Sequence, residues 1–203
     1  MKSIIVVQAR MSSKRLPGKV LRSLGGKPIL LWVIQRLQRI KGNKKIIIAT
    51  SNQEDDNQIE QLASKNNIEC FRGDLDNVLK RFVDLINYYS VEFVVRISGD
   101  SPLIDPGIIN SAISLFKKNN LDLVSNVWPR SFPIGQSVEV ISSVALKNIY
   151  KSSNKKELEH VTQGFYRLNE EYAIKNFKSE KNYSSVRLAI DDYKDFKNIE
   201  KLI

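Results

Sequence analysis

The sequence has one cysteine and one histidine among its 203 residues, and its first 53 residues contain no acidic residue. A single cysteine excludes an internal disulfide framework, and Cys70 lies in a strand pattern that is typical of a small core residue rather than a nucleophile. No apolar run approaches the roughly 20 residues of a membrane-spanning helix, and the N-terminus lacks a signal-peptide pattern. We therefore expect a cytoplasmic protein that does not act on or in a membrane.

The sequence also lacks internal repeats, low-complexity tracts and any linker rich in Gly, Pro or Ser. A chain of this length suffices for one α/β domain with a full core, and two very small domains are less favoured. We therefore expect residues 1–203 to form a single domain.

The missing acids leave the positive charge concentrated at one end of the chain. Twelve of the 32 Lys and Arg residues lie in residues 1–53, and the remaining 20 face 22 acids, so the net charge of +10 comes entirely from this quarter. Clustered cations suit either a nucleic-acid-binding protein or an enzyme that binds a triphosphate. Aromatic residues do not alternate with these cations, as a stacking platform for nucleic acid requires. We therefore expect no nucleic-acid partner, and nucleic-acid binding stays open as an alternative.

A basic stretch, Gln-Ala-Arg-Met-Ser-Ser-Lys-Arg-Leu-Pro-Gly-Lys at residues 8–19, follows an apolar run at residues 4–7 that is typical of a buried strand. It contains four cations, two hydroxyls and a Pro-Gly turn, but no acid. Arginine gives two-pronged contacts to phosphate and lysine a compact charge. Composition alone leaves two interpretations open, a polyphosphate site and a solvated basic loop.

Apolar runs alternate with segments of helical spacing along the first half of the chain. Strands are predicted at residues 4–7, 44–50, 68–71 and 93–97, with helices at 29–40, about 52–66 and 75–89 between them. This order predicts a parallel sheet with helices on both faces and a ligand site beyond the carboxyl ends of the strands. Later strands are predicted at 121–125, 136–141, 172–177 and 186–190, and later helices at 108–118, 142–150, 157–168 and from 193 to the end.

Asp100 comes directly after the strand predicted at 93–97, where its carboxylate can point into this site. Facing a triphosphate, it suits a divalent cation; the alternative is that it orders the turn. Asp105 is better placed to cap the helix that starts at Pro106. The only histidine, His160, is more typical of a structural residue than of a base.

Six motifs together resemble the cytidylyltransferases that make CMP-activated acidic sugars. The chain is most similar to the group of spore-coat polysaccharide biosynthesis protein F, with CMP-Kdo synthetase and acylneuraminate cytidylyltransferase as related enzymes. The motifs are Ala9-Arg10-x-x-Ser13-x-Arg15-Leu16-Pro17-Gly18-Lys19, Arg72-Gly73 with Asp76-x-x-Leu79-x-Arg81, Arg96-x-x-Gly99-Asp100-x-Pro102-Leu103-Ile104-Asp105-Pro106, Gly135-x-x-Val138-Glu139-Val140, Glu159-His160-Val161-Thr162 and Ile190-Asp191.

The resemblance implies a three-layer α/β/α, Rossmann-like nucleotide-diphospho-sugar transferase fold with a mostly parallel sheet. It implies transfer of CMP from CTP to a sugar acid such as a nonulosonic acid, with release of pyrophosphate, for surface polysaccharide biosynthesis. It implies that Mg²⁺ is held by Asp100 and Asp191. The residues implied to bind the nucleotide are Ala9, Arg10, Ser13, Arg15, Lys19 and Arg72, and those implied to be catalytic are Arg15, Lys19 and Asp100.

The resemblance further places the sugar side of the site at about residues 126–185, including Arg130 and Glu139. In relatives this region also builds a dimer, so a homodimer is left open. The chain departs from the family's pattern at Ser137, where an acid is usual, at Gln163, where a proline is usual, and at Asp192-Tyr193, where Thr-Pro is usual. The alternatives are a transferase for another nucleotide or acceptor, and a CTP-binding protein without turnover.

Overall fold

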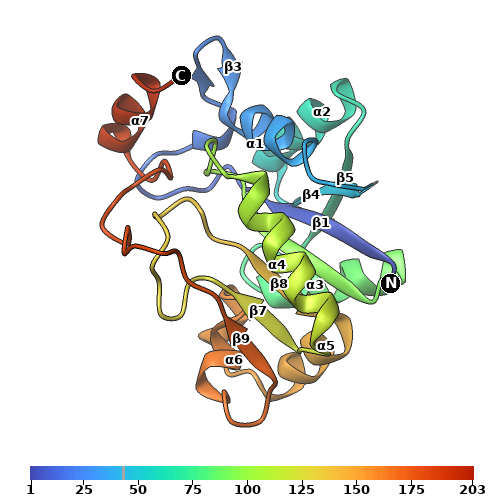
Figure 1. The fold of residues 1–203 in the computed structure, drawn as a ribbon. Coiled ribbons are helices and arrows are strands. Elements are labelled where there is room, and N and C mark those ends of the chain that lie inside the picture. The colour runs from blue at the N-terminus through green and yellow to red at the C-terminus, as the bar shows by residue number, and fades with distance from the viewer. Residues whose placement is uncertain (43) are drawn as a thin grey trace.

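A seven-stranded sheet with the strand order β5-β4-β1-β6-β8-β7-β9 forms the centre of the molecule (Figure 1). The computed structural model describes residues 1–42 and 44–203. The strands are β1 (Ser3–Gln8), β4 (Lys45–Ser51), β5 (Glu69–Gly73), β6 (Phe93–Ser98), β7 (Leu123–Ser125), β8 (Glu139–Ser142) and β9 (Ile174–Asn176). Only β8 runs against its neighbours, so the sheet is mostly parallel as predicted. Two further short strands, β2 (Ser23–Leu24) and β3 (Lys27–Pro28), pair with each other.

Helices cover both faces of the sheet, which gives the predicted three layers. Against one face pack α1 (Ile29–Leu37), α2 (Asn57–Lys65) and α4 (Pro106–Lys118), and against the other α3 (Val78–Tyr89), α5 (Ser143–Ser152) and α6 (Gln163–Arg167). Side chains of a strand alternate between faces, so Ile5 and Val7 join the first core and Ile4 and Val6 the second. This burial on both faces explains why β1 reads as a continuous apolar run.

The last helix, α7 (Tyr193–Glu200), packs on a small third core beside the basic loop. Phe196 and Ile199 of this helix and the preceding Ile190 are buried there with Leu16 and Leu24. The backbone N–H of Ile190 also donates to the carbonyl of Asp100 at 2.9 Å. These contacts bring the end of the chain to the carboxyl edge of the sheet.

Two sequence-based predictions of secondary structure are wrong. The strand predicted at residues 186–190 is an extended segment with one isolated bridge, between Ile134 and Arg187, because the residues beside it are themselves outside the sheet. The helix predicted at residues 157–168 is split into a 3-10 turn (Glu157–Glu159) and α6, because His160 is extended. Asn43, just past the helix predicted at residues 29–40, lies outside the described residues.

Candidate active site

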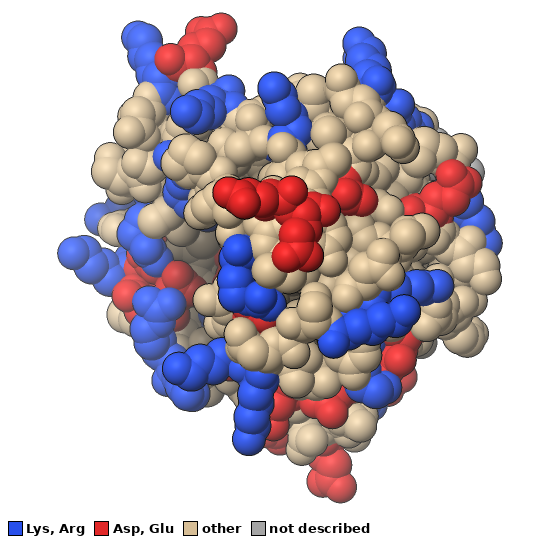
Figure 2. Space-filling model, turned by 90° about the horizontal axis from the view of Figure 1, so that it is seen from below, with Lys and Arg blue, Asp and Glu red and all other residues tan. Residues whose placement is uncertain are grey.

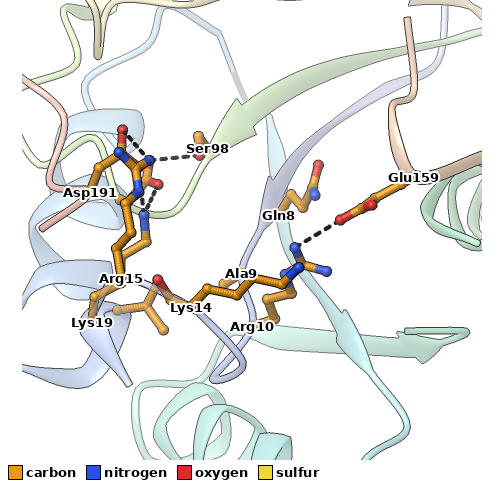
Figure 3. Close-up of a pocket in the computed structure, with 12 residues that line it drawn as sticks. Gln8, Ala9, Arg10, Lys14, Arg15, Lys19, Ser98, Glu159 and Asp191 are labelled. Atoms are coloured by element: carbon orange, nitrogen blue, oxygen red, sulfur yellow. Dashed lines mark hydrogen bonds and ion pairs between the residues drawn. The ribbon is translucent and has the colours of Figure 1, made fainter. Parts of the chain in front are cut away.

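A cavity of about 340 Å³ opens at the carboxyl ends of β1 and β6 (Figure 3). Most of its lining comes from the basic loop at residues 8–19, and the rest comes from the residue after this loop, from the end of β6 with the loop that follows it, and from two later segments. The lining residues are Gln8, Ala9, Arg10, Ser13, Lys14, Arg15, Lys19, Val20, Ser98, Asp100, Glu159 and Asp191. The structure therefore brings the basic loop together with both acids of the predicted metal site.

The basic loop is fixed by backbone contacts on both sides. The N–H of Ala9 donates to the carbonyl of Ala49 at 3.1 Å, and the N–H of Met11 donates to the buried Asp56 carboxylate at 2.7 Å. Gly18 then turns the chain back, since its N–H bonds the Met11 carbonyl at 2.9 Å and its φ of 67° suits glycine. The loop thus holds its cations toward the cavity without help from a ligand.

Lys19 lies between the two acids of the predicted metal site. Its ammonium donates to Asp100 Oδ2 at 2.5 Å, to Asp191 Oδ1 at 3.0 Å and to the carbonyl of Ile190 at 2.9 Å. An ammonium has three donors, so Lys19 has a partner for each of them. The second oxygen of Asp100 accepts a hydrogen bond from the Ser98 hydroxyl at 2.7 Å, which fixes the orientation of the carboxylate.

Asp191 is in contact with three cations. Besides Lys19, Arg15 reaches its Oδ2 at 3.1 Å and Arg187 reaches the same oxygen at 2.8 Å. Burial alone would raise the pKa of Asp191, but the hydrogen bond and charge of Lys19, with those of Arg15 and Arg187, outweigh burial and lower it. Asp191 is therefore ionised at neutral pH.

The donor set at this edge of the sheet fits Mg²⁺. Within residues 1–42 and 44–203, no group of three or more His, Cys, Asp or Glu side chains could hold a metal ion. Mg²⁺ needs no such group, because it is commonly held by one or two carboxylates together with substrate phosphates and water. Asp100 and Asp191 supply two carboxylates that already share one cation, the Lys19 ammonium.

Other predicted nucleotide-binding residues are placed differently with respect to the cavity. Arg10 and Ser13 line it, and Arg10 forms an ion pair with Glu159 at 3.1 Å. Arg72 lies outside the lining residues, because its guanidinium donates to the carbonyl of Ser51 at 3.0 Å and to the Glu60 carboxylate at 2.8 Å. The contact of Arg72 with a nucleotide stays a prediction.

Sequence reasoning singled out none of Gln8, Ser98 and Lys14 as site residues. All three line the cavity. The first two end the neighbouring parallel strands β1 and β6 and are paired in register. Their position at the end of two predicted apolar runs was the signal that could have found them, since ligands bind at this edge of such sheets.

A second cavity, of about 280 Å³, is lined by Arg96, His160, Val161, Thr162, Gln163 and Tyr166. Beneath it lies Glu139, whose side chain is 4% exposed and forms an ion pair with Arg96 across the β6–β8 pair. Glu139 also accepts hydrogen bonds from the Thr162 hydroxyl at 2.6 Å and from the Tyr166 hydroxyl at 3.0 Å. Arg96 in turn donates to Gln8 at 3.1 Å. This chain of contacts connects the second cavity to the first.

Arg130 lies near Glu139 and Tyr166 in the irregular loop before β8. Burial lowers the pKa of the Arg130 guanidinium, although the charge of Glu139 opposes this. Arg130 donates to the Ser137 hydroxyl at 3.0 Å. Ser137, where the family usually has an acid, is therefore the hydrogen-bond partner of a predicted substrate-binding residue. Trp128 of the same loop stacks on Tyr166, with 5.1 Å between ring centroids. The roles of Arg130 and Glu139 toward a substrate stay predictions.

Comparison with known proteins identifies the family. The model of the family described as cytidylyltransferase matches residues 4–202. The chain belongs to the cytidylyltransferase family. It is 30% identical over 211 residues to the spore coat polysaccharide biosynthesis protein SpsF of Bacillus subtilis, a match that covers 98% of this chain and 85% of that protein.

Solved structures agree with this assignment and with the nucleotide-diphospho-sugar transferase fold. A cytidylyltransferase from Leptospira borgpetersenii is 30% identical and superimposes with a TM-score of 0.95, over 98% of this chain and 85% of that one. A CMP:2-keto-3-deoxy-manno-octonic acid synthetase, solved in complex with CTP, superimposes with a TM-score of 0.80 at 16% identity, over 100% and 98% of the two chains. Because the synthetase is only 16% identical to this chain, its structural similarity supports the fold and not the activity.

The cations of this cytidylyltransferase are largely interspersed with acids on the face seen in Figure 2. Several cations from the acid-free first quarter pair with acids from later segments, such as Arg10 with Glu159 and Lys45 with Glu69. The local excess of charge in the sequence is therefore partly balanced in space, which weakens the nucleic-acid alternative. None of the described helices is long and apolar enough to cross a membrane.

Replacing Glu139 with Ala is expected to lower the free energy of unfolding by about 2–4 kcal/mol, because it leaves the Arg96 charge without its acid and the Thr162 hydroxyl without its acceptor, while the Tyr166 hydroxyl keeps only Ser125. The estimate is reduced because the Arg96 side chain is 26% exposed. Urea denaturation measures this loss. Glu159→Ala is the matched control, since it breaks an exposed ion pair and is expected to cost less than about 1 kcal/mol. Equal losses in the two variants would contradict a buried role for Glu139.

Proposed function

We propose that this cytidylyltransferase transfers CMP from CTP to a sugar acid of the nonulosonic-acid class, with release of pyrophosphate, for surface polysaccharide biosynthesis in the cytoplasm. The observation that carries the proposal is the convergence of the basic loop with Asp100 and Asp191 in one cavity. It supports the proposal because cations suited to a triphosphate lie beside two carboxylates suited to a divalent metal, and transfer of a nucleotide requires both parts.

Arg10, Ser13, Arg15 and Lys19 are proposed to bind the triphosphate, with Ala9 and Arg72 nearer to the nucleoside. An acceptor oxygen attacks the α-phosphorus while pyrophosphate leaves, so negative charge grows on the leaving oxygens. Arg15 and Lys19 stabilise this charge from fixed positions, and their contribution is electrostatic. Asp100 and Asp191 would hold Mg²⁺, which neutralises phosphate charge and orients the reacting groups when it is bound.

The acceptor is proposed to bind on the side of the second cavity. Arg96 and His160 line that cavity and Arg130 lies close by, so the surroundings favour an anionic group such as a sugar carboxylate. Glu139 supports this side by holding Arg96. The names of the SpsF relative and of the 3-deoxy-manno-octulosonate cytidylyltransferase of Hydrogenovibrio crunogenus, 28% identical over 152 residues, are consistent with a surface sugar acid. The region of residues 126–185 is proposed to contribute to a homodimer, as in the family.

Pyrophosphate release tests this proposal. The assay compares CTP, ATP, GTP and UTP with Mg²⁺, each with a panel of sugar acids and with their neutral counterparts. We expect release with CTP and a sugar acid, and at least tenfold less with any other nucleotide or with the neutral sugar. Faster release with another nucleotide would overturn the choice of CTP. Equal release with neutral sugars would overturn the acceptor class, and CTP binding without release would favour a binding protein.

A further inference from the structure

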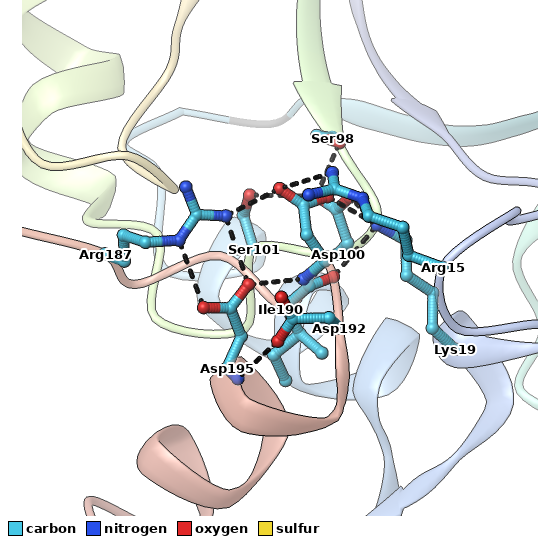
Figure 4. Close-up of polar contacts among 10 residues, drawn as sticks. Arg15, Lys19, Ser98, Asp100, Ser101, Arg187, Ile190, Asp192 and Asp195 are labelled. Atoms are coloured by element: carbon cyan, nitrogen blue, oxygen red, sulfur yellow. Dashed lines mark hydrogen bonds and ion pairs between the residues drawn. The ribbon is translucent and has the colours of Figure 1, made fainter.

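The buried carboxylate of Asp195, which Figure 4 shows facing the Arg187 guanidinium, holds Asp191 at two points. The backbone N–H of Asp191 donates to Asp195 Oδ2 at 3.0 Å. The guanidinium of Arg187 donates to both oxygens of Asp195, at 3.0 and 3.1 Å. Its Nη2 also donates to the Asp191 carboxylate at 2.8 Å. Asp195 therefore fixes the backbone of Asp191 directly and its side chain through Arg187.

The three cations on Asp191 are not equivalent in position. Lys19 and Arg15 line the cavity, whereas Arg187 is outside its lining. The three carboxylates of this cluster (Asp100, Asp191 and Asp195) are balanced by the three cations (Lys19, Arg15 and Arg187) before any ligand binds.

A nucleotide and its metal would redistribute these pairs. A metal ion held by Asp100 and Asp191 would take the place of the cation that those carboxylates share, and a triphosphate would attract Lys19 and Arg15. The Asp191 carboxylate would then lose two of its three protein partners. Of these three cations, Arg187 is the one positioned to stay, because its other contacts are to Asp195 and it does not line the cavity.

We propose that Asp195, acting through Arg187, is a positioning residue that keeps the Asp191 carboxylate directed at the metal once the nucleotide has drawn Lys19 and Arg15 away. The inference rests on the proposed function, because it takes Asp191 as a metal ligand. Asp195 and Arg187 would thus hold Asp191 in place directly before Asp192-Tyr193, where the chain departs from the family's pattern.

Capping of α7 does not account for Asp195. The N-cap of this helix is Asp192, whose carboxylate accepts from the N–H of Asp195 at 2.9 Å. The two acids thus have separate tasks: Asp192 begins the helix, and Asp195 points back to Arg187 and Asp191. Asp192→Ala removes the cap and leaves the Arg187 contacts in place, so it is a matched control for helix stability.

The test measures the affinity for Mn²⁺ at saturating CTP, with electron paramagnetic resonance reporting the concentration of the free ion. The proteins compared are the wild type, Asp195→Asn, Arg187→Gln, Arg187→Lys and Asp192→Ala. We expect about tenfold weaker Mn²⁺ binding in the first three variants, because each loses charge-assisted contacts or the planar fork that aims them. Binding of CTP in the presence of a chelator is expected to change less than threefold. Asp192→Ala is expected to lower the melting temperature without weakening Mn²⁺ binding.

Wild-type Mn²⁺ affinity in Asp195→Asn and Arg187→Gln would overturn the proposal. So would equal weakening in Asp195→Asn and Asp192→Ala, since that would reduce Asp195 to a stabilising residue. If Asp195→Asn fails to fold, Arg187→Gln still tests the proposal, because the Arg187 side chain is 39% exposed and its replacement disturbs the core less. A wild type that binds CTP but no Mn²⁺ would overturn this inference together with the metal site. A wild type that binds Mn²⁺ and CTP but accepts no sugar acid would overturn the proposed acceptor alone.

Discussion

Replacing Asp100 with Asn is expected to reduce pyrophosphate release by on the order of 10²–10³-fold, as the loss of one charged contact at a phosphoryl site commonly does. The substitution keeps the size of the side chain and the hydrogen bond with Ser98. It removes one of the two carboxylates proposed to hold Mg²⁺ and to align the α-phosphate. Initial rates with saturating CTP and acceptor, across a range of Mg²⁺ concentrations, measure the effect.

Asp105→Asn is the matched control for this experiment. Asp105 lies on the same loop, and its carboxylate accepts from the N–H of Gly107 at 2.7 Å at the start of α4. Asn caps a helix about as well as Asp, so the control removes a nearby negative charge without a structural cost. A folded Asp100→Asn protein that releases pyrophosphate at the rate of the control would remove Asp100 from the metal site.

Much of the fold could be predicted because apolar runs directly reflect burial. The neighbouring parallel strands β4, β1 and β6 are covered on both faces and are mostly apolar, whereas the edge strand β5 is only partly buried. The segment at residues 186–190 shows the limit of that signal. It is also apolar, but Ile190 is buried by a loop and a helix outside the sheet. An apolar run therefore indicates that a segment is buried, but it does not indicate which element buries the segment.

The site could be predicted only as far as its motifs extend. Asp100 and the basic loop were expected at one edge of the sheet because each follows a strand. The pairing of Arg96 with Glu139 depends on the register of an antiparallel pair 43 residues apart in the chain, which sequence spacing does not determine. The support of Asp191 by Arg187 and Asp195 was missed for a related reason. The three residues are spaced four apart, as on one helix face, but Arg187 and Asp191 lie before α7, so the spacing did not indicate the contact.

Replacing Lys19 with Met is expected to have two effects of opposite sign. Turnover should fall by on the order of 10²–10³-fold, because a cation proposed to stabilise the leaving pyrophosphate is lost. Binding of Mn²⁺ without nucleotide should become at least tenfold tighter, because Asp100 and Asp191 no longer share an ammonium at 2.5 and 3.0 Å. Rates of pyrophosphate release and Mn²⁺ titration of the nucleotide-free protein measure the two effects.

Thermal unfolding gives an independent measure of the exchange between Lys19 and a metal. In a chelator, Lys19→Met is expected to melt below the wild type, since two carboxylates that are 17% and 24% exposed then face each other without their shared cation. Mn²⁺ alone should raise the melting temperature of the variant more than that of the wild type, because a ligand that binds the folded state stabilises it.

Lys14→Met is the control, since Lys14 lines the same cavity but is not among the cations in contact with Asp100 or Asp191. If Lys19→Met loses activity while its Mn²⁺ affinity and its response to Mn²⁺ stay those of the control, Lys19 and the metal do not compete for the two carboxylates, and Mg²⁺ must bind elsewhere.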